Sequence, residues 1–108
     1  MKRKTIPAEV KEDVLQTVER FNKVKLASSD CRYLARFRGK YLYLDIEDFG
    51  QVGHICRLEY KGGKVPWEMA IYKYGSDRYD PENCWFPGNT YVDGTVAGAM
   101  KAGLVAFS

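Results

Sequence analysis

The sequence predicts an α+β domain with an N-terminal helix, a four-stranded antiparallel meander, a long ordered loop and a C-terminal helix, both helices lying on one sheet face. Three observations support this order. Apolar residues recur at helical spacing near each end of the chain, apolar and mixed positions alternate in four central segments, and short turns separate those segments. The 108 residues suit a single domain, 1–108, and the composition of 45% apolar and 29% charged residues is typical of a globular protein.

The first helix is predicted over residues 7–26, after a basic segment, residues 1–6, that we expect to be a flexible arm. Its apolar positions recur every three or four residues, as in a helix that packs one side on a core; they are Val10, Val14, Leu15, Val18, Phe21 and Val24. Pro7 suits the first helical turn, where a missing N–H breaks no helical hydrogen bond.

Four strands are predicted over residues 31–38, 41–46, 54–60 and 67–74. Gly39 and the segments EDFGQVG and KGGKVP supply the turns between them. Because parallel neighbours would need connections of a dozen or more residues, turns this short make the sheet antiparallel. Each strand has one apolar side and one mixed side, which indicates a sheet covered on a single face.

Alternation assigns the side chains of each strand to the two faces. The covered face is expected to receive Tyr33 and Phe37 from the first strand and Leu42 and Leu44 from the second. In the third strand, alternation places four residues together on one side, His54, Cys56, Leu58 and Tyr60, opposite Ile55, Arg57 and Glu59.

A loop of residues 75–91 joins the last predicted strand to the second helix. Connections this long without regular structure are uncommon and are often either functional or disordered. Its rings argue against disorder; they are Tyr79, Trp85, Phe86 and Tyr91. We expect these rings to fold back and plug the end of the core, with a binding loop as the alternative.

The second helix is predicted over residues 93–107, with Asp93 or Thr95 as its cap. Gly98 and Gly103 lie inside it, and each costs about 1 kcal/mol relative to alanine. We therefore expect their backbone to pack closely on the sheet or on the first helix. The segment PGNTYVDGT is neither a P-loop nor a dinucleotide fingerprint, so no phosphate seat is expected at the helix start.

The last third of the chain carries a resemblance. The segments AIYKYGSDRYDP, WFPG and VDGTVAGAMKAGL resemble a family of small uncharacterised prokaryotic proteins that are familiar as structural-genomics targets. The resemblance covers roughly residues 30–107. It implies a compact stand-alone domain and brings no activity, ligand or cofactor with it.

The mixed face of the predicted sheet is the candidate binding surface. Its cationic and aromatic side chains are Arg32, Arg36, Arg38, Tyr41, Tyr43, Arg57, Tyr72 and Tyr74. Tyrosine and arginine are enriched at protein interfaces, so the first expectation is contact with a protein partner or with a second copy of the chain. The alternative is single-stranded RNA or DNA, whose phosphates pair with guanidinium groups and whose bases stack on rings.

Charge does not decide between these partners. Residues 1–40 hold 11 Lys and Arg against 5 Asp and Glu, whereas residues 41–108 hold 6 against 9. The basic excess at the N-terminal end favours an anionic partner. However, Asp45, Glu59 and Glu68 are expected on the same face, where they can pair with the arginines across strands.

Binding is expected in preference to catalysis, with no cofactor, no metal and no catalytic residue. His54 is the single histidine, and it would share a strand face with Cys56. A zinc site usually shows paired ligands at each end, and the chain has no CxxC. Cys31 and Cys56 are therefore interpreted as small buried hydrophobes, and nothing in the sequence supports a nucleophile at Cys84.

Location follows from cysteine usage and hydropathy. Three cysteines are an odd number, which favours reduced thiols in a cytoplasm over a disulfide framework. No apolar stretch follows the basic N-terminus, and no apolar run approaches the 18 residues of a membrane span. We expect a cytoplasmic protein without a signal peptide or a membrane contact.

Overall fold

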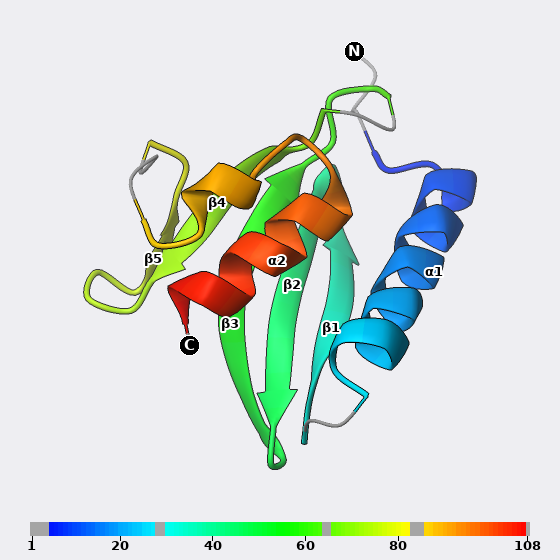
Figure 1. Cartoon of the computed structure of the whole chain (residues 1–108). Coiled ribbons are helices and arrows are strands. Elements are labelled where there is room, and N and C mark those ends of the chain that lie inside the picture. The colour runs from blue at the N-terminus through cyan, green and yellow to red at the C-terminus, as the bar shows by residue number, and fades with distance from the viewer. Residues whose placement is uncertain (1–4, 28–29, 64–65, 83–85, 108) are drawn as a thin grey trace.

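A computed structural model describes residues 5–27, 30–63, 66–82 and 86–107. The elements follow one another as α1 (Ala8–Lys25), β1 (Cys31–Arg38), β2 (Tyr41–Asp48), β3 (Gln51–Glu59), β4 (Glu68–Lys73), β5 (Arg78–Asp80), the 3₁₀ turn η1 (Asn89–Tyr91) and α2 (Val96–Ala106). The strands form one antiparallel sheet in the order β1-β2-β3-β4-β5. Figure 1 views the sheet from the side on which α1 and α2 lie, and the opposite side carries no helix.

The α+β prediction is confirmed, with one more strand than expected. The segment predicted as irregular, residues 75–91, contains β5, whose three residues pair with Ile71–Lys73 of β4. A strand of three residues is too short to show an alternating pattern, so the sequence gives it no signal. None of the described helices is both long enough and apolar enough to cross a bilayer.

The core lies between the sheet and the two helices. Tyr33, Leu42, Leu44 and Met100 are each at most 1% exposed. The Tyr33 hydroxyl donates a 2.6 Å hydrogen bond to the Met100 carbonyl, which ties β1 to α2 through the middle of the core. Because a buried hydroxyl without a partner is costly, this bond lets a tyrosine occupy a fully buried position.

Gly103 explains how α2 can lie so close to the sheet. A Cβ atom added there would lie 2.4 Å from Ile55 Cγ2 and 2.6 Å from the Tyr33 hydroxyl oxygen. The close approach predicted for this glycine is confirmed. Gly98 instead packs against the segment before α2, next to Asp93, while Thr95 caps the helix by accepting from the Gly98 N–H at 3.0 Å.

Helix α1 buries a narrower stripe than the sequence predicts. Its buried residues are Val10, Val14, Val18 and Phe21. Leu15 and Val24, expected to widen the stripe, are 49% and 69% exposed. The helix lies along the outer strand of the sheet, where the Asn22 side chain hydrogen-bonds both the N–H and the carbonyl of Tyr33. Because α1 contacts the sheet only along the edge strand β1, one row of apolar side chains is enough to cover the contact. The Asn22 amide also satisfies backbone groups of Tyr33 that no neighbouring strand pairs with.

The prediction that residues 1–6 form a flexible arm is wrong for Ile6. Residues 1–4 lie outside the described residues, but Ile6 is 3% exposed and belongs to the core. Its N–H donates to the Gly39 carbonyl at 3.2 Å. An apolar residue just before Pro7 therefore anchors the start of α1 on the β1–β2 turn.

A β-bulge in β3 decides which side chains reach the open face. Leu44 pairs with Cys56 and Asp45 pairs with His54, so Ile55 is an extra residue without a partner on β2. Ile55 and Cys56 are consequently both buried, and His54 is exposed on the other side. The predicted alternation, with His54 and Cys56 on one face, is wrong for this reason.

Candidate functional site: the open sheet face

The helix-free face, here called the open face, carries the predicted arginines and tyrosines. The register places Arg36, Tyr43, Arg57 and Ala70 in one row across β1 to β4, and Arg38, Tyr41, Glu59 and Glu68 in the next row. Arg32 lies opposite Glu47 nearer the other end of β1. Tyr72, two residues after Ala70 on β4, packs on His54 of the same face, so seven of the eight predicted residues share it.

Tyr74, the eighth, lies just beyond the end of β4. Its ring contacts both Tyr72 and Phe107, with centroids 4.7 and 5.7 Å away, and its hydroxyl donates to the His54 carbonyl at 2.9 Å. Because Phe107 follows α2, Tyr74 bridges the open face and the end of that helix. It is 55% exposed and closes one margin of the surface.

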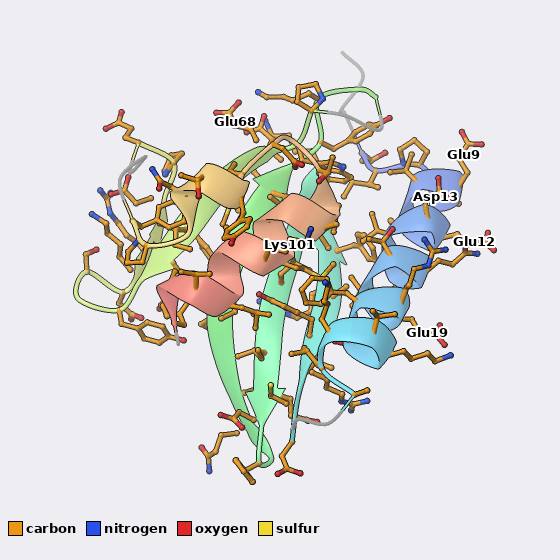
Figure 2. The ribbon with its side chains drawn as sticks, in the orientation of Figure 1. Glu9, Glu12, Asp13, Glu19, Glu68 and Lys101 are labelled. Atoms are coloured by element: carbon orange, nitrogen blue, oxygen red, sulfur yellow. The ribbon has the colours of Figure 1, made fainter. Side chains whose placement is uncertain are left out.

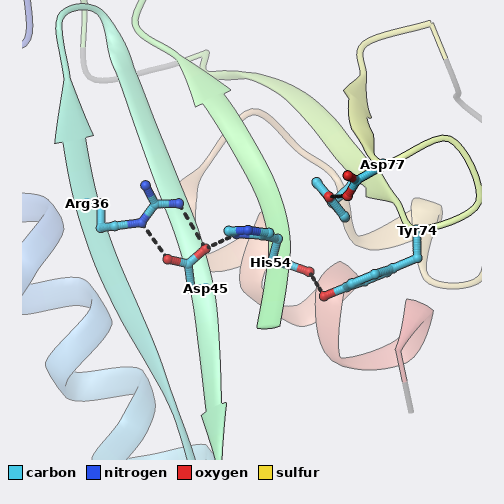
Figure 3. A network of polar contacts seen from close by, with 6 residues as sticks. Arg36, Asp45, His54, Tyr74 and Asp77 are labelled. Carbon is cyan, nitrogen blue, oxygen red and sulfur yellow. Dashed lines mark hydrogen bonds and ion pairs between the residues drawn. The ribbon is translucent and has the colours of Figure 1, made fainter. Parts of the chain in front are cut away.

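Asp45 is a buried carboxylate at the centre of a polar network (Figure 3). It is 3% exposed and accepts from Arg36 through Nε at 2.5 Å and Nη2 at 3.2 Å. His54 Nδ1 lies 3.0 Å from the same Oδ1 that accepts from Arg36 Nη2. Three strands therefore meet at one carboxylate, because Asp45 lies on β2 between its partners on β1 and β3.

Arg36 and His54 together control the charge of Asp45. Burial raises the pKa of this carboxyl, but hydrogen bonds from Arg36 and His54 and the Arg36 charge outweigh burial and hold the pKa below its ordinary value. The same pair raises the pKa of Arg36. Asp45 is therefore ionised at neutral pH.

The ionised Asp45 carboxylate determines which nitrogen of the His54 imidazole carries the proton. A carboxylate can only accept, so His54 Nδ1 must carry a proton and donate it. The ring also packs on Tyr72, with centroids 4.9 Å apart. Nε2, the second ring nitrogen, is not used by Asp45, and the His54 side chain is 46% exposed. This is the arrangement in which a carboxylate orients a histidine and leaves its second nitrogen for other chemistry.

Tyr79 of β5 covers the centre of the open face. Its ring contacts rings on three other strands, with centroid distances of 5.3 Å to Tyr43, 6.1 Å to His54 and 4.9 Å to Tyr72. Its hydroxyl is buried and forms no hydrogen bond of normal geometry. Burial, and then the Asp45 charge, raise the pKa of Tyr79 to about 12. Tyr79 was expected to plug the core, but it packs on the opposite side of the sheet; Phe86 does pack against the core.

Arg57 differs from the other central arginine. Its guanidinium carbon lies 4.5 Å from the Tyr41 ring centroid and 5.6 Å from that of Tyr79. Among the described residues it forms no ion pair with a carboxylate, whereas Arg36, stacked 4.9 Å from Tyr43, is neutralised by Asp45. Two rings thus hold the Arg57 guanidinium in place without compensating its charge.

The acidic residues of the open face are paired, as expected. Glu47 accepts from Arg32 at 3.0 Å. Glu59 pairs with Lys40 and Lys61, not with an arginine, and these hydrogen bonds lower its pKa. Glu68 also pairs with Lys61. Arg38, like Arg57, has no carboxylate partner in the described part of the chain.

The helix side shows no comparable charge excess. Figure 2 labels four carboxylates on α1, Glu9, Glu12, Asp13 and Glu19. Four cations balance them along the same helix, Lys11, Arg20, Lys23 and Lys25. By contrast, β1 to β4 and the described turns beside them place six cations on the open face, Arg32, Arg36, Arg38, Lys40, Arg57 and Lys61, against five carboxylates, Asp45, Glu47, Glu59, Glu68 and Asp77.

Sequence reasoning missed two members of this site. His54 was assigned to the wrong face because of the bulge, and Tyr79 was assigned to the core. Gly53, a glycine inside a strand, was the available signal for the bulge. Cys56 is fully buried, which raises its thiol pKa, and it lies on the opposite face from His54. Cys84, the third cysteine, lies outside the described residues.

Comparison of the chain with protein-family models, curated proteins and solved structures gives no match in any of the three. The resemblance to small prokaryotic proteins over residues 30–107 therefore stays a prediction. In the described ranges, no three His, Cys, Asp or Glu side chains gather in a way that could hold a metal ion.

Proposed function

We propose that the protein binds single-stranded nucleic acid through its open face. The observation that carries this proposal is Arg57, a guanidinium at the centre of a helix-free sheet that is stacked between two tyrosine rings and has no carboxylate partner among the described residues. Its N–H groups are available to a phosphate, and arginine recognises phosphate with several donors at once.

The surroundings of Arg57 fit a strand of nucleic acid. The charge excess supplies attraction to phosphates, and Arg38 gives a second uncompensated cation one row away. Tyrosine rings and stacked guanidinium planes are the groups on which unpaired bases stack. A sheet face that no helix covers also accommodates an extended chain better than a small molecule, which needs a concave pocket.

A protein partner was the first expectation from the sequence and uses the same residue types. The tyrosine rings do not distinguish a protein partner from a nucleic acid, but the charges do. The carboxylates Asp45, Glu47, Glu59 and Glu68 are paired with cations and Asp77 accepts from the Tyr72 hydroxyl, whereas Arg38 and Arg57 have no carboxylate partner among the described residues. This surface favours an anionic ligand, and contact with another protein is an outcome that the experiment below can reveal.

The test is a fluorescence-polarisation titration of labelled 12-nucleotide single strands, RNA and DNA, at two salt concentrations. We expect binding that weakens as salt rises, with a slope of about −0.7 per phosphate contact. Arg57→Gln should weaken binding about tenfold and lower the slope by about one contact. The matched control is Arg20→Gln, which removes the same charge from the outer surface of α1 and should leave binding unchanged.

No binding at low salt would reject the proposal. Binding that responds equally to Arg57→Gln and Arg20→Gln would move the site away from the open face. Sedimentation at the same concentrations tests the protein alternative, because a dimer that Arg57→Gln dissociates would assign this face to self-association.

A further inference from the structure

We propose that the Asp45–His54 pair cleaves bound RNA, with His54 Nε2 as the base that activates a ribose 2′-hydroxyl. This inference rests on the proposed function, because the same face must hold the strand. It goes beyond that function and beyond the sequence prediction, which favoured binding without catalysis.

The geometry of a general base is present. Asp45 accepts from His54 Nδ1 at 3.0 Å and keeps that nitrogen protonated, so Nε2 presents a lone pair when the ring is neutral. The imidazole is held on two sides, by Asp45 and by the ring of Tyr72. Asp45 in turn accepts two hydrogen bonds from Arg36 (Figure 3). Residues of three neighbouring strands, β1, β2 and β3, therefore hold the His54 side chain in one orientation.

The bulge in β3 places the base on the same face and the same strand as Arg57. Since Ile55 and Cys56 both point into the core, His54 and Arg57 are consecutive open-face positions of one strand. Bulges are frequent beside active sites, where they redirect a side chain. Without this one, His54 would face the core and no base would lie beside Arg57.

A further donor lies at the same position. Arg36 uses Nε and Nη2 on Asp45, which leaves Nη1 outside that pair. The Tyr79 ring lies against His54 and Tyr43, and its buried hydroxyl interacts with Arg36. Tyr79 therefore helps to hold both Arg36 and His54 in place from β5.

The reaction needs no co-reactant from outside. His54 Nε2 takes the proton of the 2′-hydroxyl, and the 2′-oxygen forms a bond to the adjacent phosphorus. The bond from phosphorus to the 5′-oxygen breaks, and that oxygen leaves with the electron pair and takes a proton from water. The protonated imidazole then neutralises the hydroxide. The products are a 2′,3′-cyclic phosphate and a free 5′-hydroxyl, and Arg57 stabilises the additional negative charge on phosphorus during the step.

The experiment incubates the full chain with a labelled 12-nucleotide RNA, without metal, and separates the products by electrophoresis and mass spectrometry. We expect fragments that end in a 2′,3′-cyclic phosphate. A matched strand with a single 2′-deoxy sugar should resist cleavage at that position. His54→Ala should lower the rate at least ~100-fold with RNA affinity unchanged, as expected for loss of a general base. His54→Gln, whose amide can still donate to Asp45, should be equally inactive if His54→Ala fails to fold.

Asp45 acts through His54 and is a positioning residue. Asp45→Asn should lower kcat and leave KM within about twofold, because an Asn amide that turns its NH₂ toward His54 requires Nδ1 to accept and so no longer keeps the proton on that nitrogen. Because Asp45→Asn lowers stability in either case, both constants are measured well below its Tm, where a purely structural role would weaken RNA binding together with the fall in kcat. Glu12→Gln, which makes the same chemical change on the exposed side of α1 (Figure 2), is the control and should leave both constants unchanged.

The outcomes are distinct. RNA that binds but stays intact overturns this inference and leaves the proposed function standing. RNA that neither binds nor is cleaved removes both. Cleavage that persists in His54→Ala and His54→Gln comes from another residue or a contaminating nuclease and also overturns the assignment.

Discussion

Asp45 gives the sharpest test of how the open face is organised. Asp45→Asn keeps the size of the side chain but removes its charge and replaces one acceptor oxygen with an NH₂ donor. That donor would face either Arg36, a donor itself, or His54 Nδ1, which also donates. The variant therefore loses a charge and places two donors against each other at a position that is 3% exposed.

The magnitude follows from the hydrogen bonds that the substitution breaks. A hydrogen bond to a charged group contributes about 1.5–3 kcal/mol, and removal of one partner of a buried pair costs more than the bond itself. Water moderates the effect here, since the side chains of Arg36 and His54 are 51% and 46% exposed. We expect the free energy of unfolding to fall by about 2–3 kcal/mol, which in a domain of this size lowers Tm by about 10–15 °C.

The assay is thermal and urea unfolding followed by circular dichroism, from pH 7 to pH 2.5. The folded pKa of Asp45 lies below the unfolded value of about 3.9, so its contribution is present above about pH 4 and is lost as the pH falls through the folded pKa. The difference between wild type and Asp45→Asn should therefore be full at pH 7 and shrink at the acid end.

Glu47→Gln is the matched control, because it makes the same chemical change in an exposed pair with Arg32. It should cost less than about 0.5 kcal/mol. Equal destabilisation by Asp45→Asn and Glu47→Gln, or an effect at Asp45 that does not change with pH, would refute the argument that a buried carboxylate holds three strands together.

Two further predictions concern the scaffold. Gly103→Ala should lower the free energy of unfolding by about 2 kcal/mol in urea titrations, because the added Cβ overlaps Ile55 and the Tyr33 hydroxyl. Gly75→Ala is the control and should be neutral, because a Cβ added there meets nothing within 4 Å. Equal effects of the two substitutions would contradict the close approach of α2 to the sheet. Phe49→Asn should raise the free energy of unfolding by about 0.5–1 kcal/mol. Phe49 has a φ of 52°, which asparagine adopts more readily than phenylalanine, and its side chain is 76% exposed. A lower Tm in the variant would show that the Phe49 ring makes a stabilising contact.

The sequence was informative where a regular period extends over many residues. The stripe of α1 and the alternation of β1 and β2 follow directly from side-chain geometry, so their faces are predicted correctly. The arginines and tyrosines of the open face were found for the same reason. Thr95 was among the expected caps because its side-chain oxygen can accept from the first turn of a helix.

The sequence was uninformative where one residue changes the register or where a contact is long-range. The bulge at Ile55 shifts His54 to the other face, and a single insertion leaves no periodic signal. The position of Tyr79 depends on the pairing of β5 with β4, which is fixed by tertiary contacts and not by local propensity. The width of the buried stripe on α1 depends on where the helix lies against the sheet, so Leu15 was assigned to the core by pattern alone.

The most direct measurement of the central claim is a ¹H–¹⁵N NMR titration of the labelled protein with a short single-stranded oligonucleotide. We expect the largest shifts at Tyr43, His54 and Arg57, including the Arg57 side-chain Nε–H, with α1 and the outer side of α2 unchanged. Shifts that gather on the helices, or an Arg57 side chain that does not respond at saturation, would contradict the account.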